Sequence, residues 1–298
     1  MAGAVVKNLT RGLPGASTGG DYLVTTVLGS LWAAELLEAK GIRRLSTQDR
    51  DLCSSDTLFV LGSGPDISKL SDAHWRVIAE HDSVSFNSWT RHQFVPTFYF
   101  PQTFSHTIIN ELVSARYSAA NIIVRGDLTA SLGLDSPGLT RLLGGLPAER
   151  LRFVPEFPVA RIFEEVDPAA TLNFLEALGL WRHGHVPKIM PKFRATIGLA
   201  AAFGYTMGYR KIVICGFDPR TPGHFWDNEA AKEPNKLFQS WQHLKSGPWP
   251  QEAKWYARNT VSSYINAIDQ SMRVSGVGAV FSGNIKAPNY NLQPYWAC

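Results

Sequence analysis

Hydrophobic residues along this chain occur in two arrangements, short continuous runs and repeats spaced three or four positions apart. The runs are rich in β-branched and aromatic residues and predict buried strands, whereas the spaced repeats predict helices. The expected strands cover residues 57–61, 83–87, 97–100, 121–124, 151–154, 211–218 and 278–281. The expected helices cover residues 22–40, 104–116, 137–143, 169–178, 193–209 and 259–272, with another beginning near Ser71. This alternation predicts an α/β fold with a Rossmann-like, mostly parallel sheet flanked by helices.

The strand expected at residues 57–61 leads into the glycine loop, Gly62-Ser63-Gly64-Pro65. A strand, a Gly-x-Gly turn and a following helix can aim backbone N–H groups at a phosphate, and a glycine at position 64 lets a ligand approach the backbone. The same pattern also suits a tight structural turn. The loop matches neither the dinucleotide motif, which has glycine at the position of Ile67, nor a P-loop, which continues with Lys-Ser or Lys-Thr.

Three expected strand ends carry residues that suit a ligand. They are Gly62–Pro65, Asn87 with Ser88, and Gly216–Asp218. Ligands of open α/β sheets bind beyond the carboxyl ends of the strands, so these three groups are candidates for one site. Asn87 offers a donor and an acceptor for a base or a sugar, and Asp218 can bind ribose hydroxyls. Each residue taken alone suits a turn or a cap better than a ligand, and it is their agreement across three strand ends that favours a site.

The charge of the chain limits its partners. Its 298 residues carry a net charge of +4, with a pI of ≈ 8.9 and no run of Lys or Arg. This balance favours an anionic ligand or a negatively charged membrane surface over nucleic acid. Three scattered cysteines, Cys53, Cys215 and Cys298, match neither a disulfide framework nor a zinc site and indicate a reducing compartment. We therefore expect a soluble, cytoplasmic protein, with peripheral contact at the inner membrane left open.

Two short patterns have residue types and spacings that occur in metal sites. Asp49-Arg50-Asp51 has the Asp-x-Asp form by which many glycosyltransferases hold a divalent cation, but its charged surroundings favour a solvated connection. His183 and His185 stand two residues apart in a segment rich in glycine and proline, without a third ligand nearby in the sequence. That segment, residues 182–191, is expected to be a mobile loop over a site. The sequence thus predicts no metal site.

Residues 219–255 are polar, aromatic and irregular, and they predict a lid inserted after the strand at 211–218. The tryptophans of this stretch either close a small core or stack on sugars; they are Trp226, Trp241, Trp249 and Trp255. The closing residues Tyr290, Tyr295 and Trp296 suit a packed tail as well as a membrane or oligomer contact. Residues 1–56 are expected to form a loose tail and a helix that precede the main domain.

Five short motifs follow one another between residue 57 and residue 282. They are Gly62-Ser63-Gly64-Pro65-Asp66, Asn87, Phe98-Tyr99-Phe100-Pro101, Arg194-Ala195-Thr196-Ile197, and the stretch from Gly208-Tyr209 to Gly216-Phe217-Asp218. In their order and spacing they resemble the motifs of the bacterial sialyltransferases of glycosyltransferase family 42. The family carries Gly-Asn-Gly-Pro-Ser in the first motif and uses the Asn of the second to contact the CMP part of its donor.

The resemblance implies that residues 57–298 form a glycosyltransferase domain that binds a nucleotide sugar. It implies transfer of sialic acid or a related nonulosonic acid from a CMP donor to a sugar hydroxyl of a bacterial surface glycan, as in lipooligosaccharide biosynthesis. A CMP donor carries one phosphate, so no metal and no further cofactor is expected. Two alternatives stay open, a motility-accessory glycosyltransferase for another nonulosonate and a non-catalytic nucleotide-binding module. A homo-oligomer is also left open.

The chain departs from the family pattern at several positions. Ser63 and Phe100 replace asparagines, and two tyrosines that the family places on the donor phosphate are missing. Their segment contains Arg220 and His224, which we expect to replace the phenol groups with charged donors.

Three residues are candidates for catalysis. The resemblance places Arg194 near the active site, beside Thr196, at the start of a long helix where its charge adds to the helix dipole. The family's general base is a histidine shortly before the last helix, and that position falls on Tyr256. A phenol with a pKa near 10 is a poor base at neutral pH, whereas a histidine is well matched. His243, in the same lid segment, is therefore ranked first and Tyr256 second.

Overall fold

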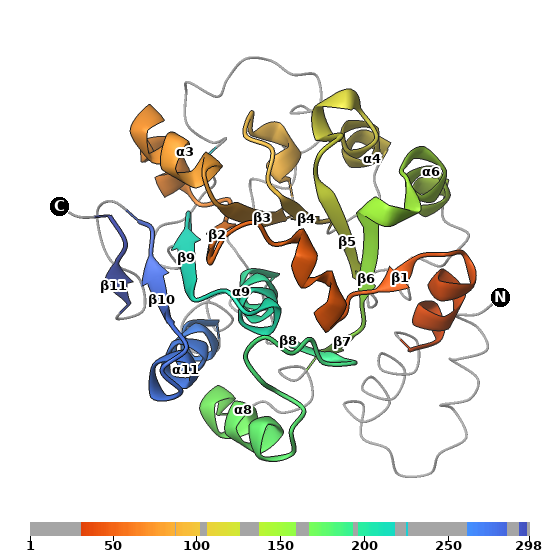
Figure 1. Ribbon diagram of the computed structural model, residues 1–298. Coiled ribbons are helices and arrows are strands. Elements are labelled where there is room, and N and C mark those ends of the chain that lie inside the picture. Colours follow the sequence, from red (N-terminus) through yellow and green to blue (C-terminus); the bar gives the residue numbers. More distant parts are fainter. Residues whose placement is uncertain are drawn as a thin grey trace, which may run out of the picture.

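The computed structural model describes residues 31–86, 88–101, 106–125, 137–158, 167–192, 196–217, 225, 261–284 and 292–296. These residues form an α/β fold around a mostly parallel, Rossmann-like sheet, as the alternation of strands and helices predicts (Figure 1). The expected tail at residues 1–20 and the expected lid, except Phe225, lie outside the described residues.

Among the described residues, nine strands form the main sheet, in the order β1-β6-β5-β4-β3-β2-β9-β10-β11, and all of their pairs are parallel. These strands are β1 (Arg43–Arg44), β2 (Thr57–Leu61), β3 (Asp82–Phe86), β4 (Phe98–Phe100), β5 (Asn121–Arg125), β6 (Leu151–Val154), β9 (Lys211–Cys215), β10 (Ala279–Ser282) and β11 (Gln293–Pro294). A second, two-stranded sheet pairs β7 (Glu156–Pro158) with β8 (Met190–Lys192), also in parallel. Because all strands of the main sheet are parallel, their carboxyl ends meet at one edge.

Helices cover both faces of the sheet. The α-helices are α3 (Asp72–Ala79), α4 (His106–Leu112), α6 (Pro137–Gly145), α8 (Pro168–Ala177), α9 (Thr196–Met207) and α11 (Val261–Val274), with a further helical stretch at residues 31–39. The 3-10 helices are η1 (Thr47–Leu52), η2 (Pro65–Lys69), η3 (Trp89–Arg91), η4 (Ala115–Tyr117) and η5 (Ala148–Arg150). Figure 1 shows α3, α4 and α6 on one face and α9 and α11 on the other, with α8 outside them.

The sheet separates two hydrophobic cores because successive strand residues point to opposite faces. In β2, Leu58 and Val60 belong to the core under α9, whereas Phe59 and Leu61 belong to the core under α3. Continuous apolar strands of this kind are typical of parallel sheets buried on both faces. The continuous apolar runs that predict the strands therefore also allow them to be buried on both faces of the sheet.

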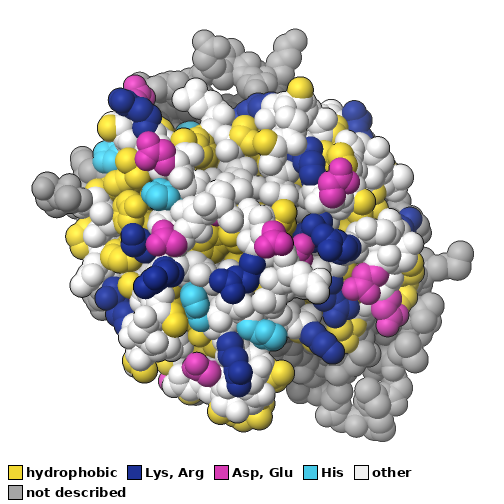
Figure 2. All heavy atoms as spheres, viewed as in Figure 1, with side chains coloured by type: hydrophobic (Ala, Val, Ile, Leu, Met, Phe, Trp, Pro, Cys, Tyr) yellow, Lys and Arg dark blue, Asp and Glu magenta, His cyan; other side chains and the backbone are white. Residues whose placement is uncertain are grey.

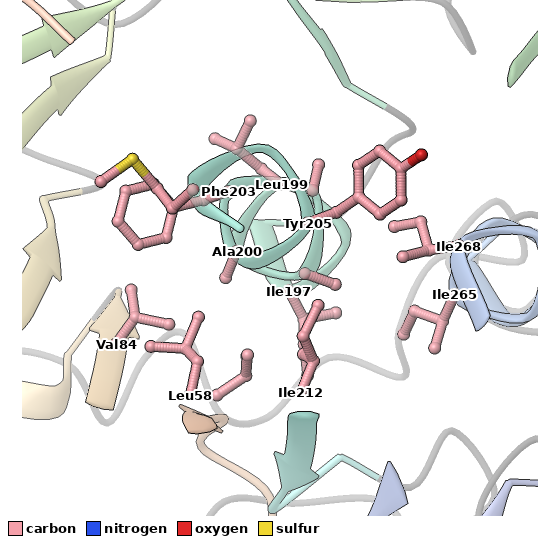
Figure 3. Packing of buried hydrophobic residues seen from close by; sticks show 14 of the residues in the cluster. Leu58, Val84, Ile197, Leu199, Ala200, Phe203, Tyr205, Ile212, Ile265 and Ile268 are labelled. Atoms are coloured by element: carbon pink, nitrogen blue, oxygen red, sulfur yellow. The ribbon is translucent and has the colours of Figure 1, made fainter. Parts of the chain in front are cut away.

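The central helix is α9, in which every residue is buried. Its small residues let it approach the sheet closely: a Cβ at Gly204 would lie 2.9 Å from Leu58 Cδ2 and 3.0 Å from Ile212 Cδ1. Figure 3 shows α9 between the strand residues Leu58, Val84 and Ile212 and the α11 residues Ile265 and Ile268. A helix that is apolar all round must be covered by other elements on all sides, and α9 is covered in this way.

The final described residues pack onto the sheet. The ring centroids of Tyr295 and Trp296 lie 5.2 and 5.8 Å from that of Phe59, and Trp296 Nε1 donates a 2.8 Å hydrogen bond to the Gly283 carbonyl. Of the alternatives that the sequence leaves open for these two residues, the packed tail is the one observed. Tyr290 lies outside the described residues.

On the face seen in Figure 2, Lys and Arg side chains alternate with Asp, Glu and His over the coloured part of the surface. Within the described part of the chain, no helix combines the length and the hydropathy that crossing a bilayer requires.

Candidate functional site

The glycine loop lies where the direction of strand order reverses. From β2 the chain builds outward through β3, β4, β5 and β6, and it then returns to place β9 on the other side of β2. Such a topological switch point opens a crevice between the carboxyl ends of the two strands, and open α/β sheets bind ligands there. Gly62–Pro65 follow β2 and Gly216 follows β9, so both line this switch point.

Three glycines allow the two loops to touch. Gly62 N donates to the Cys215 carbonyl at 2.8 Å, and Gly64 N donates to the Gly216 carbonyl at 2.6 Å. A Cβ at either position would meet the Gly216 oxygen, at 2.6 Å from Gly62 and 2.5 Å from Gly64. Contact between two loops of the protein therefore requires glycine at position 64. The sequence analysis attributes the same requirement to the approach of a ligand.

Asn284 fixes the turn after β9. Gly216 has φ +63, and its N–H donates to Asn284 Oδ1 at 3.1 Å, while Asn284 Nδ2 donates to the Phe217 carbonyl at 3.3 Å. Asn284 is buried and follows β10, the strand beside β9. The sequence analysis did not select Asn284. Its position near the end of an expected strand, which is also the position of Asn87, would have been a reason to select it.

An aromatic cluster backs the glycine loop. It consists of Trp75, Trp89, His92, Phe94 and Phe225, with ring centroids 4.6 to 6.3 Å apart where they are in contact. Phe225 also joins the loop through its backbone, because its N–H donates to the Ser63 carbonyl at 2.9 Å and its carbonyl accepts from Ser68 Oγ at 3.2 Å. One residue of the expected lid is thus bonded to the glycine loop.

Burial, together with the nearby positive charge of Arg116, lowers the pKa of His92 to about 4. The imidazole is therefore neutral at pH 7, and its Nδ1 accepts a hydrogen bond from Phe94 N at 3.1 Å. His92 belongs to the wall of the site and supplies no positive charge to it.

The structure describes some of the sequence-predicted site residues and leaves others undescribed. Gly62, Ser63, Gly64, Pro65 and Gly216 lie together at the switch point. Ser88 follows β3, the next strand along, and precedes η3. The candidates outside the described residues are Asn87, Arg194, Asp218, Arg220, His224, His243 and Tyr256.

Thr196 is the first residue of α9 and is 8% exposed. Because α9 returns the chain to the amino end of β9 across about 18 Å, its own first turn lies toward the carboxyl edge. Thr196 therefore lies toward the same edge of the sheet as the glycine loop.

A buried group of charges also lies at the carboxyl edge, and sequence reasoning missed it. The Glu156 carboxylate accepts from Arg125 Nε at 2.7 Å and Nη2 at 3.3 Å, and from Lys192 Nζ at 3.1 Å. Arg125 ends β5, Glu156 begins β7 and Lys192 ends β8. Burial of three charged side chains requires such mutual pairing.

Asp49 is not the solvated connection that the sequence predicts. Its side chain is 3% exposed and forms a 2.6 Å ion pair with Arg152 Nε, while Ser46 N donates to its other oxygen at 2.9 Å. Arg152 is at the beginning of β6, so this pair lies toward the amino edge of the sheet. The capping box and the ion pair account for Asp49 without a ligand, and they hold it on the edge opposite the glycine loop.

The loop containing His183 and His185 does not cover the carboxyl edge, contrary to expectation. Gly184 N donates to the Tyr205 carbonyl at 3.0 Å, and His183 Nε2 is 2.9 Å from the Tyr209 carbonyl, to which it donates. Both carbonyls are at the end of α9, next to the amino end of β9. Within the described part of the chain, no group of three or more His, Cys, Asp or Glu residues is arranged to hold a metal.

A pocket of ≈ 780 Å³ lies at the same amino edge, between η1 and the end of α9. Its lining includes Arg50, Asp51, Cys53, Tyr209 and Arg210. Burial raises the pKa of the Cys53 thiol to about 11 and that of the Tyr209 phenol still further, so both groups are neutral at pH 7. Neither Cys53 nor Tyr209 is therefore activated as a nucleophile or a base. We prefer the switch point as the candidate functional site.

The described part of the site supplies a hydroxyl and an aromatic wall near the carboxyl ends of β2 and β9. Such groups can bind and orient a nucleotide or a phosphorylated sugar. His243 and Tyr256, the two residues that the sequence analysis ranks for proton transfer, fall outside the described residues.

No protein-family model matches the chain, and no curated protein sequence matches it. Among solved structures it is similar to the sialyltransferase CstII from Campylobacter jejuni, in a complex with the substrate analogue CMP-3FNeuAc, with 12% identity and a TM-score of 0.42 over 80% of this chain and 85% of that one. It is similar to the monofunctional alpha-2,3-sialyltransferase Cst-I from the same organism, with 12% identity and a TM-score of 0.40 over 80% of each chain. At these values the likeness concerns the general fold and assigns no activity to this chain.

Proposed function

We propose that this protein transfers sialic acid or a related nonulosonic acid from a CMP donor to a sugar hydroxyl of a bacterial surface glycan. The observation that carries the proposal is the position of the glycine loop at the switch point between β2 and β9. That crevice is where an open parallel sheet binds a nucleotide. The ordered motifs shared with glycosyltransferase family 42 narrow the nucleotide to CMP and the reaction to glycosyl transfer.

In this proposal the donor lies across the carboxyl ends of β2, β3 and β9. The glycine loop and Gly216 bind the phosphate and ribose side, while Asn87 and Ser88 bind the cytidine. Asp218, Arg220 and His224 complete the donor site. Support for His224 comes from Phe225, the residue that follows it, because Phe225 is hydrogen-bonded to Ser63 and to Ser68.

The chemistry requires two protein contributions. The donor carbon is tertiary, so its bond to CMP breaks largely before the acceptor attacks, and positive charge beside the departing phosphate lowers the barrier. Arg194, Arg220 and His224 are the proposed sources of that charge. The acceptor hydroxyl must also lose a proton, for which His243 is the first candidate and Tyr256 the second.

The proposed reaction needs no metal, because a single phosphate leaves and cationic side chains can stabilise it. The proposed partners are the nucleotide sugar and a glycan acceptor, met in the cytoplasm or at the inner face of the membrane.

Incubation with CMP-sialic acid and a lactose-terminated acceptor tests the reaction. We expect release of CMP and formation of a sialylated product, both unchanged by EDTA. Binding of CMP without turnover would favour a non-catalytic nucleotide-binding module, and turnover of a different CMP-nonulosonate would favour a motility-accessory enzyme. Activity lost in EDTA and restored by manganese would contradict the metal-free mechanism.

The placement of the phosphate at the glycine loop predicts the effect of charge at position 63. Ser63→Asp is expected to weaken CMP binding about tenfold or more in a calorimetric titration, because a carboxylate near the phosphate repels it. Ser63→Asn is the matched control, since Asn has the shape of Asp without its charge, and it should bind CMP at least as well as Ser63. Equal affinities of the two variants would show that the phosphate lies elsewhere.

A further inference from the structure

The pocket at the amino edge has a first wall, η1, that other parts of the chain hold in place. The capping box of Ser46 and Asp49 closes the start of η1, and the buried ion pair of Asp49 with Arg152 fixes it to β6. Thr47 Oγ1, which lines the pocket, accepts a 3.2 Å hydrogen bond from Val186 N. This wall therefore depends on no ligand for its position.

The other walls are the connection that precedes β2 and the end of α9. The Asp82 carboxylate joins them, because it accepts from Ser55 N at 3.0 Å and from the Tyr209 hydroxyl at 2.9 Å. Arg210 N also donates to the Asp56 carbonyl at 2.8 Å. A pocket of ≈ 780 Å³ between walls that are already fixed has the size of a small-molecule site, and a ligand that enters it orders little of the protein.

The Arg50 side chain lies against two glycines beside this pocket. A Cβ at Gly208 would be 2.8 Å from Arg50 Nη2, and a Cβ at Gly184 would be 3.3 Å from Nη1. Glycine at both positions therefore leaves the space that the guanidinium occupies. Among the described residues, the Arg50 guanidinium has no hydrogen-bond or ion-pair partner, so its N–H groups can bind a ligand.

Charged side chains of both signs line the pocket. They are Arg50, Asp51, Asp56 and Arg210, and within the described part of the chain no ion pair joins any two of them. Near the centre of the face in Figure 2, cationic and anionic side chains lie next to one another, in the region where Figure 1 places α9. The pocket thus presents cationic donors and anionic acceptors to a molecule inside it.

This combination suits a sugar that carries a negative charge. A guanidinium binds a phosphate or a carboxylate through paired N–H groups, whereas a carboxylate accepts hydrogen bonds from hydroxyls. Gln48, which also lines the pocket, adds an amide that both donates and accepts. A free phosphate ion would meet the arginines but would leave the aspartates without a donor.

We propose that the pocket at the amino edge is a second binding site, for an anionic sugar such as a sugar phosphate or a sugar acid. Arg50 and Arg210 bind the anionic group, and Asp51 and Asp56 accept hydrogen bonds from the hydroxyls. The site lies on the edge of the sheet opposite the glycine loop, so its ligand does not compete with a nucleotide at the switch point. The inference does not depend on the proposed function.

Calorimetric titration with glucose 6-phosphate and with glucuronate tests the site, at low ionic strength because salt screens exposed charges. We expect saturable binding of at least one of them, tighter than that of glucose or of inorganic phosphate, each of which offers only part of the recognised groups. Preference for glucose 6-phosphate would identify a sugar phosphate, and preference for glucuronate a sugar acid. Absence of binding by both, or equal binding of inorganic phosphate, would overturn the proposal.

Arg50→Gln and Arg210→Gln test the residues. Each is expected to weaken binding of the better probe by about tenfold to a hundredfold, because each removes a charged hydrogen-bond donor. Arg76→Gln is the matched control, since it removes the same charge from an exposed residue of α3, which does not line the pocket. Circular dichroism checks that all three variants are folded. Equal affinities of the three variants would mean that only the overall charge matters, and the proposal would be wrong.

The position of the probe is measured separately, by NMR of the backbone amides. With the better probe, we expect chemical-shift changes over residues 47–56 and 207–210 and none at residues 62–64. Changes confined to residues 62–64 would place the probe at the glycine loop and overturn the second site. None of these measurements uses CMP, so failure of the proposed function would leave them unaffected.

Discussion

Gly216→Ala is expected to lower the free energy of unfolding by about 2–5 kcal/mol and to abolish the proposed nucleotide binding. The residue has φ +63, which costs an alanine about 1–2 kcal/mol. Its new Cβ would also lie 2.3 Å from Ile67 Cγ1 and 2.7 Å from the Gly62 carbonyl oxygen, and relief of such overlap costs about 1–3 kcal/mol more. Any movement of Gly62 displaces the glycine loop, so binding should be lost together with stability.

Gly276→Ala is the matched control. Gly276 has φ +66, close to that of Gly216, but a Cβ added there would meet no heavy atom of the other described residues within 4 Å. It should lose only the conformational contribution of about 1–2 kcal/mol. Urea denaturation of both variants isolates the effect of the contact, and a calorimetric CMP titration of the folded fraction measures binding. Equal losses of stability would mean that the two loops do not press against each other.

Asp49→Asn is expected to lower the free energy of unfolding by about 3–5 kcal/mol, because it leaves the buried Arg152 guanidinium without its anionic partner. The side chains of this pair are 3% and 4% exposed, so water cannot replace the lost partner. Asparagine can still accept the hydrogen bond from Ser46 N, which confines the change to the charge. Chemical denaturation measures the difference.

The double variant Asp49→Asn with Arg152→Met separates the pair from its surroundings. Removal of both charges should recover part of the loss, since no unpaired buried charge remains. If the single and double variants are equally unstable, the loss in Asp49→Asn does not come from an unpaired buried charge. Turnover at a permissive temperature should be unaffected in the single variant, and a loss that manganese alone reverses would revive a metal role for Asp49.

Much of the site's location follows from local sequence. The runs at Leu58–Leu61 and Ile212–Cys215 could be assigned as strands because a parallel sheet buried on both faces requires continuous apolar residues. The glycines after them mark the turns, and a glycine at position 216 is needed for its positive φ. What the sequence could not supply was the partner of each glycine, the carbonyl of another loop more than 150 residues away.

Short strands and buried charges escaped prediction for a different reason. Met190-Pro191-Lys192 has no strand pattern, and it pairs only because β7 and the Tyr264 hydroxyl are already in place beside it. Asp49 has the sequence context of a solvated charge, yet a partner 103 residues away makes its burial favourable. The position of His183 was also misjudged, since the end of α9 determines it.

The sequence by itself determined the alternation of strands and helices, the glycine loop and the strand ends that suit a ligand, because periodicity and backbone requirements are local properties. Tertiary structure alone decided that β9 returns to the side of β2, that Asn284 and Phe225 hold the two loops, and that Glu156 joins Arg125 to Lys192. These contacts link residues far apart in the chain. Their free energy depends on distances and on exclusion of water that exist only after the sheet and its helices have packed together.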